Sequence, residues 1–246
     1  MGKEEANMPS ARLFLGTSGF SYKEWRGIFY PEDLPAKSYL SFYAKHFNTT
    51  EINNTFYRLP TPKLTQGWHD EVPNDFSFTL KLSQKITHIR RLKNVEVEME
   101  VFLNAAAELK GKLGPILVQL PPNLKKNIEV LGQFLSQYAA GRKLAFEFRH
   151  ESWFVAEVYG LLREHGAALG VVETEKSEDA PTPLEVTGSF VYMRLRKGEY
   201  STAELERWAD WIRAQDKDVY CYMKHDAKAP VLAQNLMDVL EKRPRQ

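Results

Sequence analysis

The feature that most constrains the fold is the stretch of residues 144–153, which reads LAFEFRHESW. It begins as a short, mostly apolar run, which predicts a strand buried on both faces. The run then gives way to two carboxylates, a guanidinium, an imidazole and an indole between positions 147 and 153. A buried strand whose end is crowded with ionisable groups is typical of the catalytic edge of a parallel α/β fold. We therefore expect the working groups of the protein to gather where this strand ends.

The rest of the chain supplies seven more segments that read as strands. Together the predicted strands are residues 12–18, 49–52, 76–82, 115–120, 144–148, 168–172, 190–196 and 219–223. Most of them are separated by segments with the apolar spacing of a helix. The segment 173–188 is an exception, because it has two prolines, mixed charge and no apolar stripe. The helix after the sixth strand should therefore be reduced or missing.

Eight strands that alternate with helices predict a single-domain α/β fold, the TIM (β/α)8 barrel. The length of 246 residues suits this fold, which typically takes ~250 residues. A doubly wound open sheet is the alternative, but no strand is followed by a phosphate-binding glycine fingerprint. We expect residues 1–11 to form a flexible leader and residues 12–246 to form the barrel domain.

Charge, cysteine content and hydropathy narrow the functional classes. The 33 basic and 32 acidic residues nearly balance, so only a local basic cluster could argue for a nucleic acid partner. The lone cysteine, Cys221, excludes an internal disulfide framework and a multi-cysteine zinc site. No apolar run approaches the ~18 residues of a membrane span. These features predict a cytoplasmic protein with no membrane partner, and they leave its oligomeric state open.

The strand ends supply the candidate site residues, because TIM-barrel enzymes carry their functional groups there and in the loops that follow. Charged, amide and aromatic side chains occupy most of these positions. The candidates are Tyr22, Trp25, Glu51, Asn53, Lys81, His88, Gln119, Glu147, Arg149, His150, Trp153, Arg194 and Arg196.

Alternation along the fifth strand predicts which of its side chains enter the barrel. Glu147 and Arg149 share one parity, and the two phenylalanines beside them share the other. If the phenylalanines face the helices, Glu147 and Arg149 point inward. A charge inside a barrel is costly unless it is paired. Glu147 therefore needs a cationic partner, for which Lys81 and Arg194 are the candidates.

The leading hypothesis is a hydrolase or lyase that acts on a phosphate-bearing ligand, with nucleic acid as one form of that ligand. Cations at the mouth would hold the anion, a carboxylate would act as general base and a histidine as general acid. The residues in these roles are Lys81, Arg149, Arg194 and Arg196 for the anion, Glu51 or Glu147 for the base, and His88 or His150 for the acid. The loop 83–94 is locally basic, and it is either solvated or contacts phosphate.

Other classes stay open. A non-catalytic barrel could capture a small anionic metabolite with the same cations and with the aromatic rings of Tyr22, Trp25 and Trp153. A carboxylate-pair glycosidase would need the carboxyl groups of Glu51 and Glu147 about 5–10 Å apart. A divalent metal is a further possibility, although no HxH or HExxH spacing joins the usable ligands. Those ligands are His88, Glu147, His150, His225 and Asp226.

Five motifs in order resemble a known family, the YecE-like family or domain of unknown function 72, across about residues 13–240. They are GTSGFSYKEWRGIFYP, FNTTEINNTFYRLP, FTLKLSQKITH, GPILVQLPP and EFRHESW. The resemblance implies a TIM barrel, similar to the endonuclease IV and xylose isomerase type, with no established reaction. It also implies a set of pocket residues: Glu51, Asn53, Lys81, His88, Gln119, Glu147, Arg149, His150 and Trp153.

The chain departs from the family pattern after the last two strands. After the seventh strand the family has Arg-x-His-Gly, whereas this chain has Arg-Leu-Arg-Lys at 194–197. After the eighth strand the family has Phe-Asn-Asn-Asp, whereas this chain has Met-Lys-His-Asp at 223–226. Both changes are expected to add positive charge to the mouth. Either the ends of the seventh and eighth strands do not carry the chemistry that the family shares, or the chain belongs to a subgroup with a more anionic ligand.

Overall fold

The computed structural model of the chain describes residues 11–173, 182–224 and 227–242. The predicted leader lies outside the described residues except for Ala11. Within the described ranges, no helix is long and apolar enough to cross a bilayer.

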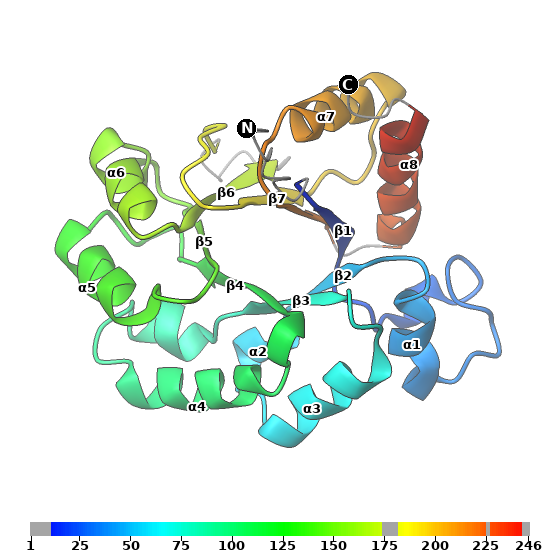
Figure 1. Cartoon of the computed structure of the whole chain (residues 1–246), viewed down its shortest axis with the longest axis horizontal. Helices are drawn as coiled ribbons and strands as arrows, with labels where there is room; N and C mark the ends of the chain where they lie inside the picture. Colours follow the sequence, from blue (N-terminus) through cyan, green and yellow to red (C-terminus); the bar gives the residue numbers. More distant parts are fainter. Residues whose placement is uncertain (1–10, 174–181, 225–226, 243–246) are drawn as a thin grey trace, which may run out of the picture.

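Eight parallel strands close into one barrel in the order of the sequence, so the predicted TIM barrel is confirmed (Figure 1). Each observed strand overlaps the segment predicted for it. The strands are β1 Leu13–Ser18, β2 Thr49–Ile52, β3 Ser77–Lys81, β4 Leu113–Gln119, β5 Leu144–Glu147, β6 Ala168–Glu173, β7 Val191–Leu195 and β8 Val219–Met223.

Helices surround the barrel and cover its outer face (Figure 1). Several begin with the caps that their sequences favour; Ser201 and Glu204, for example, form a complete capping box. Between β6 and β7, residues 182–190 contain no helix, and residues 174–181 of the segment predicted to lack one lie outside the described residues. The helices are α1 Tyr39–Tyr43, α2 Asn54–Tyr57, α3 Pro62–Glu71, α4 Glu96–Ala107, α5 Ile128–Tyr138, α6 Ala156–Glu164, α7 Thr202–Arg213 and α8 Ala229–Lys242.

Alternation along the strands divides the side chains between two cores. One set faces the helices and forms the large outer core. The other set fills the lumen, where Phe14 stacks on Tyr220 with ring centroids 4.4 Å apart. The barrel is therefore packed, as is usual for this fold. The buried lumen cluster consists of Phe14, Leu117, Ala145, Ala168, Phe190, Tyr192, Tyr220 and Tyr222.

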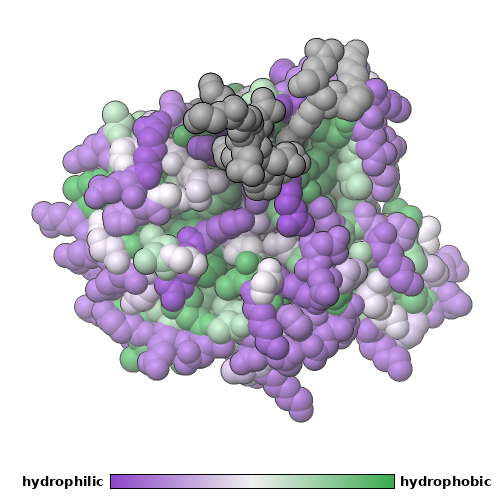
Figure 2. All heavy atoms as spheres, viewed as in Figure 1, coloured by the Kyte–Doolittle hydropathy of each residue, from purple (hydrophilic) through white to green (hydrophobic). Residues whose placement is uncertain are grey.

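The lumen becomes polar toward the carboxyl ends of the strands. At mid-height, the hydroxyl of Tyr222 lies 2.8 Å from the Thr49 hydroxyl and 2.7 Å from the Thr79 hydroxyl. One step further along, the strand register pairs Ser18 with Glu51. It likewise pairs Gln119 with the carboxyl-terminal residue of β5. Ionisable side chains from several strands are thus brought to one level. In the view of Figure 2, hydrophilic residues cover most of the rim that the helices form around the molecule.

Candidate functional site

Arg194 lies between two buried carboxylates and forms the centre of the site. Its Nη2 donates to Glu51 Oε1 at 2.8 Å, and its Nη1 donates to Glu147 Oε2 at 2.5 Å. All three side chains are buried. The predicted cationic partner of Glu147 is therefore Arg194, contributed by β7 from across the barrel, and Glu147 points inward as predicted.

The carboxylate of Glu51 is also held by neutral donors. It accepts hydrogen bonds from Ser18 Oγ at 2.9 Å, Asn53 Nδ2 at 3.0 Å and Tyr192 OH at 2.5 Å. Burial alone would raise the pKa of Glu51, but Arg194 and the Tyr192 hydrogen bond outweigh it and hold that pKa below its ordinary value. Glu51 is therefore ionised at neutral pH.

Glu147 is held by a largely cationic environment. Its Oε1 accepts from Gln119 Nε2 at 2.6 Å and from Arg149 Nε at 3.1 Å. Arg196 Nη1 lies 3.6 Å from the same oxygen. Burial raises the pKa of Glu147, but the guanidinium groups of Arg194, Arg149 and Arg196 overcome this effect and lower it well below its usual range. Glu147 is a carboxylate at any pH near neutral.

Lys81 is the one cation here whose charge is not matched by a direct partner. Its side chain enters the lumen at the end of β3, and the residue is 9% exposed. The ammonium lies 4.2 Å from the centroid of the Phe56 ring and makes no hydrogen bond or ion pair with any described residue. Burial and the positive charge of Arg194 lower the pKa of Lys81 to about 8, although the nearby carboxylates of Glu147 and Glu51 oppose this shift.

We call these six residues, Glu51, Lys81, Glu147, Arg149, Arg194 and Arg196, the central cluster. Two carboxylates face four cationic groups in it, which leaves a surplus of two positive charges when Lys81 is protonated. Arg194 Nε is also buried without a hydrogen-bond partner among the described residues. A cluster with this balance can accept a further anion.

The two candidate histidines differ from the roles predicted for them. His88 lies in a single π-helical turn, Lys85–Ile89, where its ring packs edge-on against Phe56 at 4.9 Å. Burial, together with the positive charges of Lys81 and Arg149, lowers the pKa of His88 to about 4. An imidazole that is neutral at pH 7 holds no extra proton to give, so His88 is poorly suited to act as general acid.

His150 is engaged by the loop after β5. Its Nδ1 accepts a hydrogen bond from the Ser152 backbone N–H at 3.1 Å and lies 2.9 Å from the Ser152 hydroxyl. The ring thereby caps the short turn Glu151–Trp153. This contact is local and structural, because it joins His150 to a residue of the same turn.

The aromatic candidates are mostly part of the scaffold. Trp25 is fully buried and packs against Tyr22 at 4.9 Å and Phe29 at 6.0 Å. Trp153 is buried, stacks on Phe148 at 4.6 Å and donates its indole N–H to the Leu124 carbonyl. The two tryptophans are therefore packed into the scaffold and present no exposed ring face to a ligand.

Tyr22 lies closer to the central cluster. Its hydroxyl donates to the Ser18 carbonyl at 2.8 Å, and Ser18 in turn donates to Glu51. Burial, with a contribution from the charge of Glu51, raises the pKa of Tyr22 to about 12. Half-buried beside the mouth, Tyr22 is the one predicted aromatic that remains placed to meet a ligand.

The charge expected from the two departures after β7 and β8 is only partly present. Arg196 does join the central cluster. Lys197, in contrast, is neutralised by Glu173 at 3.1 Å and Glu204 at 2.9 Å. His225 and Asp226 lie outside the described residues. The described residues contain no group of three or more histidine, cysteine or acidic side chains that could hold a metal ion.

The basic loop after β3 forms one side of a groove of about 460 Å³ next to the loop after β4. Three residues of this loop have left-handed backbone: Arg91, Leu92 and Asn94, with φ of 52°, 66° and 52°. Of the cations that line the groove, Arg90 is paired with Glu98 and Lys126 with Glu157. The groove is lined by five cationic residues, Arg90, Arg91, Lys93, Lys125 and Lys126.

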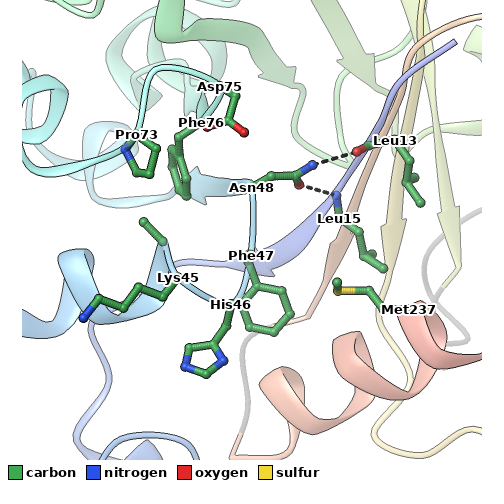
Figure 3. Close-up of a pocket in the computed structure, with 11 residues that line it drawn as sticks. Leu13, Leu15, Lys45, His46, Phe47, Asn48, Pro73, Asp75, Phe76 and Met237 are labelled. Atoms are coloured by element: carbon green, nitrogen blue, oxygen red, sulfur yellow. Dashed lines mark hydrogen bonds between the residues drawn. The ribbon is translucent and has the colours of Figure 1, made fainter. Parts of the chain in front are cut away.

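A pocket at the opposite end of the barrel has a different character (Figure 3). It measures about 450 Å³ and lies among the segments that precede β2 and β3, with Met237 of α8 on its far side. Asn48 donates to the Leu13 carbonyl at 2.8 Å and accepts from the Leu15 N–H at 3.1 Å. It thereby extends the hydrogen bonding of β1, so this pocket is a feature of the scaffold.

Sequence reasoning missed two side chains that shape the site. Tyr192 binds Glu51 from β7, and its shared parity with Arg194 was an available signal. Phe56 forms the wall against which both Lys81 and His88 pack. Nothing in the sequence marks that residue, because it comes from the short helix α2 and reaches β3 only through the fold.

Comparison with known proteins identifies the family. The chain matches the family model described as "Protein of unknown function DUF72" over residues 14–246. It is 27% identical over 143 residues to the UPF0759 protein YecE of Escherichia coli strain K12, which is 58% of this chain and 50% of that protein. The match thus spans half the length of this curated relative.

Solved structures share the fold. A DUF72 family protein from Thermotoga maritima is 27% identical, with a TM-score of 0.80 over 94% of this chain and 98% of that chain. A DUF72 family protein from Enterococcus faecalis is 21% identical, with a TM-score of 0.76 over 94% and 98% of the two chains. Since the family model spans nearly all of the chain, and the ordered motifs and the barrel agree with it, this chain belongs to the DUF72 family.

Proposed function

We propose that this protein binds a phosphate-bearing ligand at the carboxyl end of its barrel and acts on it as a hydrolase or lyase. The observation that carries the proposal is the surplus of positive charge in the central cluster. Both carboxylates are already engaged by Arg194, and the guanidinium groups of Arg149 and Arg196 beside them are partly exposed, so an anion at the mouth can reach their positive charge.

The protonation states reassign the acid–base role within this proposal. A carboxylate whose pKa is held far below neutral is a weak base, which disfavours Glu147 and Glu51 as proton acceptors. Lys81, with a pKa of about 8, is the group of the central cluster that changes protonation nearest neutral pH. We therefore assign proton transfer to Lys81, with the two carboxylates fixing Arg194.

The geometry disfavours the glycosidase alternative. Such an enzyme needs space for the scissile bond between its carboxyl groups and a raised pKa on one of them. Here the guanidinium of Arg194 occupies the position between Glu51 and Glu147, and the pKa of each carboxyl is lowered. A non-catalytic anion-binding barrel uses the same contacts as our proposal and differs from it only in having no turnover.

The groove beside the mouth supports an extended ligand, including a nucleic acid strand, as a second candidate. Its five cations are opposed directly by two acidic partners, so it can hold a second phosphate beyond the one at the central cluster. Binding to such a ligand should weaken steeply with salt, because each neutralised phosphate releases counterions. No binding of single- or double-stranded nucleic acid at low salt would remove this candidate.

Isothermal titration of the full chain with inorganic phosphate and with small phosphate esters tests the main proposal. We expect Arg149→Gln and Arg196→Gln to weaken phosphate binding about tenfold or more each, since a hydrogen bond to a charged group contributes ~1.5–3 kcal/mol. Arg163→Gln is the matched control, because Arg163 pairs with Glu185 on the outer surface. Absence of phosphate binding at low salt would contradict the proposal, and binding without turnover of any ester would leave the non-catalytic barrel.

A further inference from the structure

We propose that the side-chain nitrogen of Lys81 is a nucleophile that forms an imine with the carbonyl carbon of the substrate. This inference rests on the proposed function and names its substrate class, an aldehyde or ketone that also carries a phosphate or similar anionic group. Of the two reactions in the proposed function it selects the lyase, because imines assist the cleavage of carbon–carbon and carbon–heteroatom bonds next to the carbonyl. In that reaction Lys81 acts as nucleophile in place of its role in proton transfer.

The first support is the unusual isolation of the Lys81 ammonium. It is buried at the end of a barrel strand, where functional groups of this fold lie. Its nearest described contact is the face of Phe56 at 4.2 Å, and it has no acceptor among the described residues. Buried lysines are normally paired. Lys112, which is 5% exposed, follows that rule by donating to the carbonyls of His69 and Val72, both at 2.7 Å.

The second support is the electrostatic setting, which suits an amine nucleophile. An amine attacks a carbonyl only when neutral, and neighbouring cations and burial both favour the neutral form. With a pKa of about 8, roughly one Lys81 in ten is neutral at pH 7, against roughly one in three thousand for an ordinary lysine. Arg194 and Arg149, which contribute to this effect, belong to the same cluster that would hold the anionic group.

The step is balanced without any further reagent. The nitrogen of Lys81 forms a bond to the carbonyl carbon, and the carbonyl oxygen takes up a proton to give a carbinolamine. The oxygen then leaves as water, carrying both protons that the neutral amine gave up. Protonation of the resulting imine makes the carbon an electron acceptor for cleavage at the adjacent bond, and water later reverses the linkage and frees the amine.

Reductive trapping on the full-length protein tests the inference. The probe is glycolaldehyde phosphate with sodium cyanoborohydride, and peptide mass spectrometry measures the labelling rate of each lysine. We expect Lys81 to be labelled at least tenfold faster at pH 7.5 than the exposed Lys63, with a rate that rises with pH to a midpoint near 8. Inorganic phosphate should slow the labelling. Labelling of Lys81 no faster than that of Lys63 would overturn the inference.

Further arms separate this inference from the proposed function. If phosphate binds by calorimetry but Lys81 is not labelled, the inference fails and the proposed function stands. Suppose that neutral glycolaldehyde labels Lys81 as fast as glycolaldehyde phosphate does, and that inorganic phosphate does not compete. Lys81 would then be confirmed as a nucleophile, but the assignment of an anionic substrate would be wrong. Lys81→Arg keeps the charge without a nucleophilic amine, so it should retain phosphate binding within about threefold and lose turnover. The trapping experiment uses the native protein, so it can contradict the inference even if Lys81→Arg fails to fold.

Discussion

Two buried lysines mark the difference between the ends of the barrel. Lys112, just before β4 at the amino end, has both of its carbonyl partners at 2.7 Å. Lys81, at the carboxyl end of β3, has none among the described residues. Hydrogen bonds to two carbonyls offset much of the cost of burying the Lys112 ammonium. A buried ammonium left without acceptors lowers stability, so we infer that Lys81 is retained for another reason. The comparison shows that burial alone does not distinguish a structural lysine from a functional one.

The lumen repeats this contrast on a larger scale. Its amino end is filled by rings such as Phe14 and Phe190, which need no partner beyond close packing, and by Tyr220, whose hydroxyl accepts a hydrogen bond from Lys143 at 2.9 Å. Its carboxyl end is filled by Glu51, Glu147 and Arg194, whose burial is tolerable only because each neutralises another. Stability at the first end should depend little on pH, and stability at the second should depend on it strongly.

Arg194→Met should have the largest effect on stability. It leaves Glu51 and Glu147 buried without their shared cation, and we expect the free energy of unfolding at pH 7 to fall by about 3–5 kcal/mol. Urea denaturation measures the loss, and Arg163→Met on the outer surface, which should change stability by less than about 1 kcal/mol, is the control.

The pH dependence identifies the cause of that loss. In the native protein the pKa of both carboxyls is lowered, so their contribution is present above about pH 4.5 and declines as the pH falls further. In the Arg194→Met variant, burial should instead raise the pKa of both carboxyls. Lowering the pH toward 4.5 would then protonate them and reduce the loss of stability that the substitution causes. An equal loss at pH 4.5 and pH 7 would show that packing, rather than charge, explains it.

Lys112→Met tests the amino-end lysine. The substitution removes both donors to the buried carbonyls of His69 and Val72, so we expect a loss of about 2–3 kcal/mol in the free energy of unfolding. Phosphate binding should be unchanged, because the site lies at the other end of the barrel. A variant as stable as the native protein would show that Lys112 does not stabilise the fold, which would remove the contrast with Lys81.

Lys81→Met should stabilise the protein, in contrast to the two preceding substitutions. Replacing a buried charge that has no direct partner by an apolar chain should raise the free energy of unfolding at pH 7 by about 1–3 kcal/mol. The pKa of Lys81 is about 8 in the folded chain and 10.5 as its ordinary value. The unfolded state therefore binds more protons between these values, and the stability of the native protein rises with pH there. The advantage of Lys81→Met should shrink across this window; a constant advantage would contradict the assigned pKa.

Asn48→Ala should have the smallest effect of the four. Asn48 is exposed, and its side chain replaces two backbone partners of β1. We expect a loss of about 1 kcal/mol, measured by urea denaturation, with no change in phosphate affinity. Any weakening of phosphate binding would show that the pocket of Figure 3 communicates with the opposite end of the barrel.

The sequence allowed much of the fold to be predicted, because strand spacing and alternation are local signals. The same rules brought Glu51, Lys81, Glu147 and Arg194 to one end of the barrel. They could not decide whether Lys81 or Arg194 pairs with Glu147, because that choice depends on the closure of the sheet between distant strands.

Two side chains have surroundings that the sequence did not indicate, for a common physical reason. Trp153 was expected to meet a ligand, but an aromatic residue in a loop gives no sign of what covers its ring, and here Phe148 does. His88 was expected to donate a proton, but its pKa reflects burial and the charges of Lys81 and Arg149, which come from other elements. Side-chain burial and protonation state are properties of the assembled barrel, and the one-dimensional pattern does not contain them.

The contacts of Arg194 also bear on the order in which the chain assembles. It binds Glu51 from 143 positions away and Glu147 from 47, so the cation that the two carboxylates share is absent until β7 has been synthesised and docked. Contacts this distant in sequence form late, after shorter loops have closed. Substitutions of Arg194 should then accelerate unfolding far more than they slow folding, and the hydrated charges of the incomplete barrel should keep its open end soluble during synthesis.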